Sequence, residues 1–324
     1  PRRAEASHRW SEVELRALRH CRSGCHRVAE PVACPVMIIL DGGTGTLVQA
    51  LGAPMNGDTW CADANLTHPE IVRAAHRAYL DAGAEVLIAN TYATSPLLFN
   101  HLGRDDDVAD IDAAAVRLAR EASEGSVPVA GSFSVMRPGI PGSDRSEMLR
   151  QWPEAEARRL FAAKAEGFVT AGADVIAMEM MRDGDYSVWA IEAAAATGLP
   201  VWVGIAVEED EAGRLIGFGR PNWLLDDFVE SLLRCAPAMV SVMHTAPPTT
   251  TRALEVVRRH WRGSLGAYAE SGYFAMPDWQ FVDIIPESDY VDLAKQWDES
   301  FDLAMIGGCC GMGPSHIAAL RAAF

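Results

Sequence analysis

From Val36 onward, eight short apolar runs alternate with eight longer amphipathic segments. Such alternation predicts βα units and a parallel sheet. The apolar runs are nearly continuous, as expected for strands that are buried on both faces. Eight units, in a length close to the usual ~250 residues plus loops, favour a closed barrel over an open sheet. The sequence therefore predicts an α/β protein, a (β/α)8 TIM barrel in a single domain.

The predicted strands are rich in apolar and β-branched residues. The first leads into the glycine-rich segment Gly42–Gly45, and the last ends in two glycines followed by two cysteines. In chain order the eight strands are Val36–Asp41, Glu85–Tyr92, Val127–Phe133, Asp174–Met181, Pro200–Val207, Ala238–Thr245, Ser264–Ser271 and Leu303–Cys310.

The predicted helices follow the strands one by one and are rich in alanine, leucine and arginine. Thr67 and Asn222 are expected to cap the first and the fifth helix, because their side-chain oxygens can accept from free amides. Gly83 and Gly172 are typical helix ends. In chain order the helices are His68–Ala82, Asp106–Glu124, Pro153–Ala171, Asp185–Thr197, Trp223–Arg234, Thr249–Trp261, Glu287–Glu299 and Pro314–Ala323.

Composition limits the partners of the protein. The chain has 324 residues, 49% of them hydrophobic, and a net charge of −16. This charge argues against nucleic acid, whose phosphates require clustered Lys and Arg, and favours a small molecule. No apolar stretch approaches the ~20 residues of a membrane helix, so no membrane partner is expected. Seven scattered cysteines do not form a secreted disulfide framework, which favours a reducing cytoplasm. A homo-oligomer is left open.

Residues 1–36 differ from the rest of the chain and are predicted to be an N-terminal appendage. Arginines outnumber acidic residues there, and no apolar core of signal-peptide type is present. The appendage is expected to be either disordered or not native, with Met37 as the natural start. The predicted barrel occupies residues 37–324.

The carboxyl ends of barrel strands converge on one face, where open sites are built. Cys309 and Cys310 lie at such an end with glycines on both sides. Glycine lets a backbone approach a ligand closely, and thiolates suit a soft metal such as zinc. A metal site at the barrel mouth is therefore predicted. The alternatives are two small buried hydrophobic side chains or a strained vicinal disulfide.

The sequence from Met37 onward resembles the homocysteine S-methyltransferases, a family of zinc-dependent barrels. The most specific match is at the eighth strand. The matching segments are Leu40–Thr46, Ala82–Glu85, Asn90–Tyr92, Gly131–Ser132, Gly172–Asp174, Met178–Glu179, Gly307–Gly311 and Pro314–Ile317.

The resemblance implies a zinc ion held by three cysteines, two from the eighth strand and one from the end of the sixth. In this chain His244 stands where the third cysteine is expected. Histidine is itself a good zinc ligand, so the predicted cofactor is zinc and its predicted ligands are His244, Cys309 and Cys310. The alternative is that His244 only caps a strand end. Glu270 is a second departure, at a turn where the family usually has asparagine, and no role is assigned to it.

The resemblance also implies roles for the strand-end polar groups. Asp41 and Glu179 would bind the amino group of a homocysteine-like acceptor, or else be ordinary solvated groups at the barrel mouth. Tyr92 would offer its ring to a methylated cation, or else pack in the core. Asp41, Glu179 and Tyr92 are the predicted catalytic residues, and Trp60, Phe133 and Tyr273 are further candidates for the role of Tyr92. The predicted substrate-binding residues are Asp41, Gly42, Gly43, Thr44, Ser132 and Glu179.

The expected activity is methyl transfer from a small onium donor, such as S-methylmethionine, S-adenosylmethionine or a betaine, to the zinc-bound thiolate of homocysteine, giving methionine. The expected partners are a small-molecule thiol and a methyl donor. Three alternatives are kept: a methyltransferase for a different thiol, a barrel with a binding role and no catalysis, and, last, a metal hydrolase.

Overall fold

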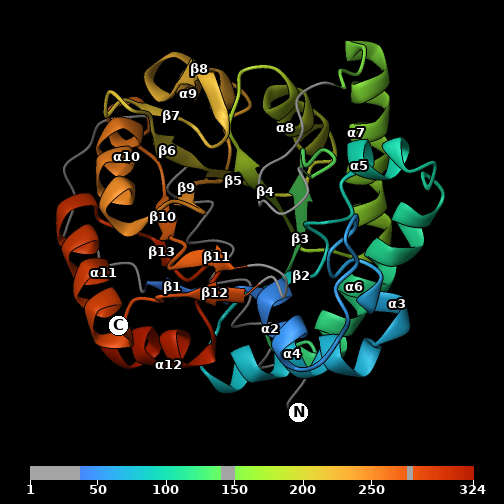
Figure 1. Ribbon diagram of the computed structural model, residues 1–324, viewed down its shortest axis with the longest axis horizontal. Helices are drawn as coiled ribbons and strands as arrows, with labels where there is room; N and C mark the ends of the chain where they lie inside the picture. The colour runs from blue at the N-terminus through green and yellow to red at the C-terminus, as the bar shows by residue number, and fades with distance from the viewer. Residues whose placement is uncertain (1–36, 140–149, 276–279) are drawn as a thin grey trace, which may run out of the picture.

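Eight parallel strands form one sheet in the order β1-β13-β10-β9-β5-β4-β3-β2 (Figure 1). The outer strands β1 and β2 meet through a parallel bridge between Leu40 and Val86, so the sheet closes into a barrel. This confirms the predicted (β/α)8 class. The strands are β1 Ile38–Ile39, β2 Leu87–Ala89, β3 Val129–Ser134, β4 Val175–Met181, β5 Val201–Ile205, β9 Met239–Met243, β10 Leu265–Tyr268 and β13 Met305–Ile306.

The computed structural model describes residues 37–139, 150–275 and 280–324. The predicted appendage, residues 1–36, lies outside the described residues. Within the described ranges, no helix is both long and apolar enough to cross a membrane.

The eight predicted helices are all present, and Figure 1 shows them around the outside of the sheet. Gly83 and Gly172, predicted as helix ends, have φ values of +100° and +80°, in the left-handed region that favours glycine. The helices are α4 Pro69–Asp81, α6 Asp107–Ser123, α7 Glu154–Ala171, α8 Tyr186–Ala196, α9 Leu225–Leu232, α10 Pro247–His260, α11 Glu287–Phe301 and α12 Pro314–Ala323.

The two predicted N-caps are wrong. Asn222 lies inside strand β8, Arg220–Leu224, and α9 begins after it. Thr67 ends a short helix, α3 Ala64–Thr67, and its hydroxyl donates to the carbonyl of Asp63. In both places a short additional element occupies the segment that local sequence assigned to the start of a helix.

Additional elements follow the carboxyl ends of several barrel strands, on the face where the site was expected. None of them was predicted, because each is only three to seven residues long and has little periodicity. They are the helices α2 Thr44–Ala50, α3 and α5 Pro96–His101, the antiparallel sheet of β6 Val207–Glu209, β7 Leu215–Gly217 and β8, and the hairpin of β11 Tyr273–Ala275 and β12 Gln280–Val282.

Two packed layers support this face. Phe133, Phe161 and Phe168 belong to a large cluster between the strands and the outer helices. A smaller cluster that includes Trp202 and Met305 contains residues from seven of the barrel strands. Because the barrel is packed with side chains, a ligand has room only where the strands end.

Candidate metal centre and active site

A cavity of about 120 Å³ lies at the carboxyl ends of the barrel strands. The lining is mostly apolar, with a few convergent polar groups. It comprises Gly42, Gly43, Thr44, Gly45, Thr46, Met55, Trp60, Cys61, Ile88, Ala89, Asn90, Tyr92, Ala93, Glu179, Met180, Met243, His244, Tyr268, Phe281, Gly308, Cys309 and Cys310.

The three predicted metal ligands lie together in this cavity. Single ligand atoms of His244, Cys309 and Cys310 all lie within 4.8 Å of one another. The Sγ atom of Cys309 is 3.6 Å from Nδ1 of His244 and 4.0 Å from Sγ of Cys310. Both cysteines are free thiols, so they do not form the vicinal disulfide considered from the sequence.

The separations suit a tetrahedral zinc ion. Bonds of about 2.3 Å to sulfur and about 2.0 Å to nitrogen place two sulfur ligands about 3.8 Å apart, and a sulfur and a nitrogen ligand about 3.5 Å apart. The observed distances of 4.0 and 3.6 Å are close to both values. Two of the three separations thus match zinc coordination, and the third, between His244 and Cys310, lies within 4.8 Å. Two thiols and one imidazole are a donor set that zinc accepts, with a fourth position left for substrate.

Local backbone structure turns His244 toward the thiols. Its φ is +42°, an uncommon value for a residue other than glycine. The ring of Phe218 packs edge-on against the imidazole, with centroids 4.9 Å apart. Contacts with the surrounding structure must hold the backbone in this unfavourable conformation, as is common at functional sites.

Without a positive charge nearby, the Cys309 thiol favours its protonated form. The hydrogen bond to Cys310 and burial raise the pKa of Cys309 well above its usual range, while His244 acts in the opposite direction. A bound divalent cation reverses this preference, because it stabilises the thiolate directly. The Cys309 thiol would therefore exchange its proton for a metal ion.

Two predicted carboxyl groups are buried at the strand ends, and of these Glu179 lines the cavity whereas Asp41 does not. Asp41 is 1% exposed; its Oδ2 accepts from the backbone N–H of Ile88 at 2.7 Å, and its Oδ1 has no hydrogen-bond partner among the described residues. Burial raises the pKa of Asp41 well above its usual range, and the charge of Glu179 adds to this shift. Two neighbouring buried carboxylates with an unused acceptor are suited to a ligand that brings positive charge.

Glu179 lines the cavity and is hydrogen-bonded by two hydroxyl groups. Ser132 donates to its Oε2, and Tyr268 hydrogen-bonds the same carboxyl group. Burial raises the pKa of Glu179 to about 7, although these two bonds and the nearby His244 lower it. The predicted residue Ser132 is itself fully buried and does not line the cavity, so it holds Glu179 rather than contacting the space where a ligand would lie.

The glycine-rich first loop also lies at the cavity, as predicted. A Cβ on Gly42 would lie 2.4 Å from the carbonyl oxygen of Met312, and one on Gly43 would lie 2.9 Å from that of Cys309. Glycine is therefore required here, because the first and the last barrel strand ends approach each other closely. This contact brings the loop against the segment that carries the two cysteines.

Aromatic side chains form another wall of the cavity. The rings of Tyr92 and Trp60 lie 5.9 Å apart, and the Tyr92 hydroxyl donates to the sulfur of Met180 at 2.7 Å. The suggestion that Phe133 could offer its ring to a methylated cation is wrong, because Phe133 packs against Phe161 and Phe168 in the core. Tyr273 is 59% exposed and lies outside the cavity lining.

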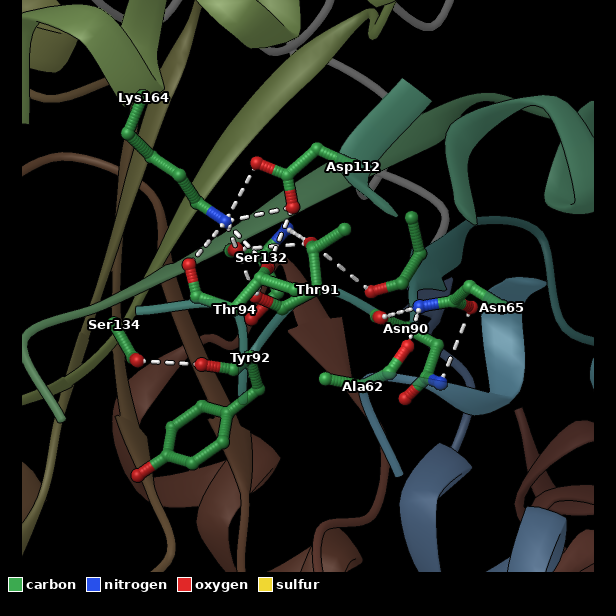
Figure 2. Close-up of polar contacts among 11 residues, drawn as sticks. Ala62, Asn65, Asn90, Thr91, Tyr92, Thr94, Asp112, Ser132, Ser134 and Lys164 are labelled. Carbon is green, nitrogen blue, oxygen red and sulfur yellow. Dashed lines mark hydrogen bonds and ion pairs between the residues drawn. The ribbon is translucent and has the colours of Figure 1, made fainter. Parts of the chain in front are cut away.

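A buried polar network holds the loop that carries Tyr92 (Figure 2). The Lys164 ammonium donates to the Thr94 hydroxyl at 2.6 Å and to the Thr94 carbonyl at 3.0 Å, and pairs with Asp112 at 2.7 Å. The Thr91 hydroxyl in turn donates to the carbonyl of Ser132 at 2.9 Å. In Figure 2 the ring of Tyr92 points away from Lys164. The network thus fixes the backbone and leaves the ring free to line the cavity.

Several lining residues were not singled out from the sequence. They include Met180, Met243, Tyr268 and Phe281. Tyr268 and Met243 are the last residues of β10 and β9. Their position at a strand end could therefore have identified them as residues that line the site. Phe281 comes from the unpredicted hairpin and had no such signal.

A barrel that gathers two thiols and an imidazole at its mouth, with a buried carboxyl group beside them in the cavity, has a donor set that could hold a metal ion, as in metal-dependent barrel enzymes. The sequence profile of one family, described as homocysteine S-methyltransferase, matches residues 38–324. The chain therefore belongs to the homocysteine S-methyltransferase family and is a methyltransferase.

Relatives of known name agree with this assignment. Betaine–homocysteine S-methyltransferase 1 of Rattus norvegicus is 29% identical over 310 residues, covering 88% of this chain and 71% of the relative. Homocysteine S-methyltransferase 1 of Zea mays is 27% identical over 313 residues, covering 87% of this chain and 92% of the relative. The metallated form of the homocysteine methyltransferase MmuM from Escherichia coli has the same fold, with a TM-score of 0.69 at 24% identity over 88% of this chain and 96% of that one.

Proposed function

We propose that the protein is a zinc-dependent S-methyltransferase that moves a methyl group from a small onium donor to the thiolate of homocysteine, giving methionine. One observation carries this proposal: ligand atoms of His244, Cys309 and Cys310 lie within 4.8 Å of one another in a cavity that Glu179 also lines. Membership of the family supports the same reaction.

His244, Cys309 and Cys310 would hold the zinc ion. When bound, zinc supplies a redox-inert positive charge that keeps a substrate thiol ionised near neutral pH. A free thiol has a pKa of ~8.5 and is mostly protonated there, so it is a poor nucleophile without such help.

The carboxyl groups of Asp41 and Glu179 would bind the ammonium group of homocysteine. An ammonium ion supplies the charge that two buried carboxylates need and a donor for the unused Oδ1 of Asp41. The backbone of Gly42–Thr44 lines the same cavity and would lie near the substrate carboxylate. These contacts would orient the thiol toward the metal ligands.

Tyr92 and Trp60 would receive the methyl donor. Aromatic faces attract onium cations without a formal negative charge. This wall lies in the same cavity as the metal ligands, so a donor there could present its methyl group to a thiolate held by the zinc. The mostly apolar lining would also exclude water, which competes as a nucleophile.

The test measures zinc content and methionine formation in the wild type and in His244→Ala and Cys309→Ala. We expect both variants to lose most of the zinc and the activity with homocysteine and S-methylmethionine or betaine. The control is Cys235→Ala, because Cys235 is a free thiol outside the cavity lining. Full zinc in His244→Ala would remove this residue from the ligand set. Methylation of another thiol but not of homocysteine would refute the proposed acceptor.

A further inference from the structure

Ser134, the last residue of β3, is a buried serine that has no role in the function proposed above. It is 0% exposed, and its Oγ atom donates to the backbone carbonyl of Tyr92 at 2.6 Å. Figure 2 shows this bond. Tyr92 is the residue whose ring would face the methyl donor, so Ser134 holds the backbone of the proposed donor site.

This bond lies beyond the end of the backbone pairing between β2 and β3. The last paired residues of the two strands are Ala89 and Gly131. Past this point, the Thr91 hydroxyl accepts from the backbone N–H of Ser132 and donates to its carbonyl, both at 2.9 Å. Ser134 adds the next link along β3. Side chains therefore fasten the loop after β2 to β3 where the strand ladder no longer does.

The same face of β3 also holds the carboxyl group that would bind the acceptor. Residues two apart on a strand share a face, and Ser132 donates to Oε2 of Glu179. Ser134 lies opposite Glu179 in the pairing of β3 with β4. The far end of the Tyr92 side chain also meets β4, because its hydroxyl donates to the sulfur of Met180 at 2.7 Å. The proposed donor and acceptor sites are thus both fastened to one strand, by two serines.

We propose that Ser134 is a positioning residue for the methyl donor: its hydroxyl fixes where the Tyr92 ring lies relative to Glu179. This inference rests on the proposed function, because it requires the donor to bind at Tyr92. The attraction between a cation and a ring depends on where the cation lies over the ring face. A shift of the loop would therefore weaken donor binding, while Glu179 keeps its hydrogen bond from Ser132 and still binds homocysteine.

The test measures the KM of each substrate while the other is saturating. The substrates are homocysteine and whichever of S-methylmethionine, betaine and S-adenosylmethionine the wild type uses. In Ser134→Ala the KM of the donor should rise about 2–10-fold, the range for one lost neutral hydrogen bond, and the KM of homocysteine should stay at the wild-type value. Ser132→Ala should show the opposite pattern, with a rise of about 10-fold or more for homocysteine, because a bond to a carboxylate is lost.

The matched control is Ser231→Ala. Ser231 lies on α9, outside the cavity lining, and its hydroxyl donates to the backbone carbonyl of Phe228 at 2.6 Å, so the same kind of bond is lost. Both KM values should equal those of the wild type. Ser134→Thr keeps a hydroxyl and should restore the KM of the donor. The thermal midpoint shows whether each variant is folded, and Ser134→Cys, a weak donor of similar shape, serves if Ser134→Ala is not.

Three results would separate the possible failures. If the wild type forms no methionine with any of these donors, the proposed function fails and this inference fails with it. If the wild type is active and Ser134→Ala keeps the wild-type KM for the donor, only the role of Ser134 fails. If Ser134→Ala raises both KM values equally, or Ser134→Thr is as impaired as Ser134→Ala, positioning of the donor by this hydroxyl is refuted.

Discussion

At the scale of single residues, Glu179 shows how a binding site can cost stability. The barrel buries its carboxyl group among hydroxyl groups and apolar side chains, and burial raises its pKa from 4.5 to about 7. Such a group ionises more readily in the unfolded chain than in the folded one. The charge that would hold a substrate ammonium is therefore unfavourable in the folded protein until the ligand arrives.

The pH dependence of unfolding tests this cost. Because the folded pKa lies above the unfolded one, the wild type loses stability as pH rises from about 4.5 to about 7, and the loss is then complete. Glu179→Gln lacks this titration. In urea unfolding, the stability of Glu179→Gln relative to the wild type should rise by roughly 1–2 kcal/mol between pH 5.5 and pH 8.

The matched substitution for this measurement is Glu211→Gln. Glu211 is exposed in the folded protein, so its carboxylate is in contact with water before and after unfolding. The free energy of unfolding of Glu211→Gln should differ from that of the wild type by the same amount at both pH values. A Glu179→Gln difference that is equally independent of pH would contradict the explanation.

At the scale of elements, the ion pair of Lys164 on α7 and Asp112 on α6 joins two helices to the loop that carries Tyr92. The two side chains are 0% and 1% exposed. Burial lowers the pKa of Lys164 and raises that of Asp112, so each charge depends on its partner and on Thr94. Removing one partner leaves the other buried and uncompensated.

Unfolding of a double-mutant cycle measures this dependence. Lys164→Met should destabilise the protein by about 3–5 kcal/mol, because an unpaired carboxylate remains in the core. Adding Asp112→Leu should recover most of the loss, since two apolar side chains can replace a buried ion pair. Additive losses in the double variant would refute the interpretation.

An exposed ion pair provides the comparison. Arg77 and Asp81 on α4 are 2.9 Å apart, but their side chains are 57% and 63% exposed. Arg77→Met should therefore change the free energy of unfolding by less than about 1 kcal/mol.

At the scale of the whole molecule, the barrel closes through a short seam between β1 and β2. Besides the bridge between Leu40 and Val86, the backbone N–H of Glu85 donates to the carbonyl of Ile39 at 2.7 Å. The side chain of Glu85 adds to the closure, because its Oε2 accepts from the N–H of Ile39 at 3.1 Å and its Oε1 pairs with Arg321 at 3.2 Å. The Glu85 side chain thus supplies part of the hydrogen bonding that a longer pair of strands would supply through its backbone.

Hydrogen exchange tests the importance of this seam. Glu85→Ala removes the acceptor of the Ile39 amide, and a lost hydrogen bond of about 0.5–1.5 kcal/mol corresponds to exchange roughly 2–10 times faster. Amides in the middle of β4 should be unaffected. Glu192→Ala removes a carboxylate paired with Arg158 away from the seam and should leave Ile39 unchanged. Equal exchange of Ile39 in all three proteins would show that the side chain does not close the barrel.

The site was predictable where its residues lie at the carboxyl ends of strands. Glu179, His244, Cys309 and Cys310 all follow or end apolar runs, and the structure brings them to one cavity. Phe133 shows the limit of this argument. Successive residues of a strand face opposite sides, so Ser132 reaches Glu179 inside the barrel while Phe133 packs against the outer helices.

The sequence by itself determined the number and order of the βα units and the strand ends at which the chemical groups lie, because hydrophobic periodicity is a local property of the chain. Only the tertiary structure decided that His244 faces both Cys309 and Glu270, that Ser132 supports Glu179 from outside the cavity, and that short hairpins complete the mouth. These arrangements depend on strand register, barrel closure and a few unusual backbone angles, which arise from contacts between residues far apart in the sequence.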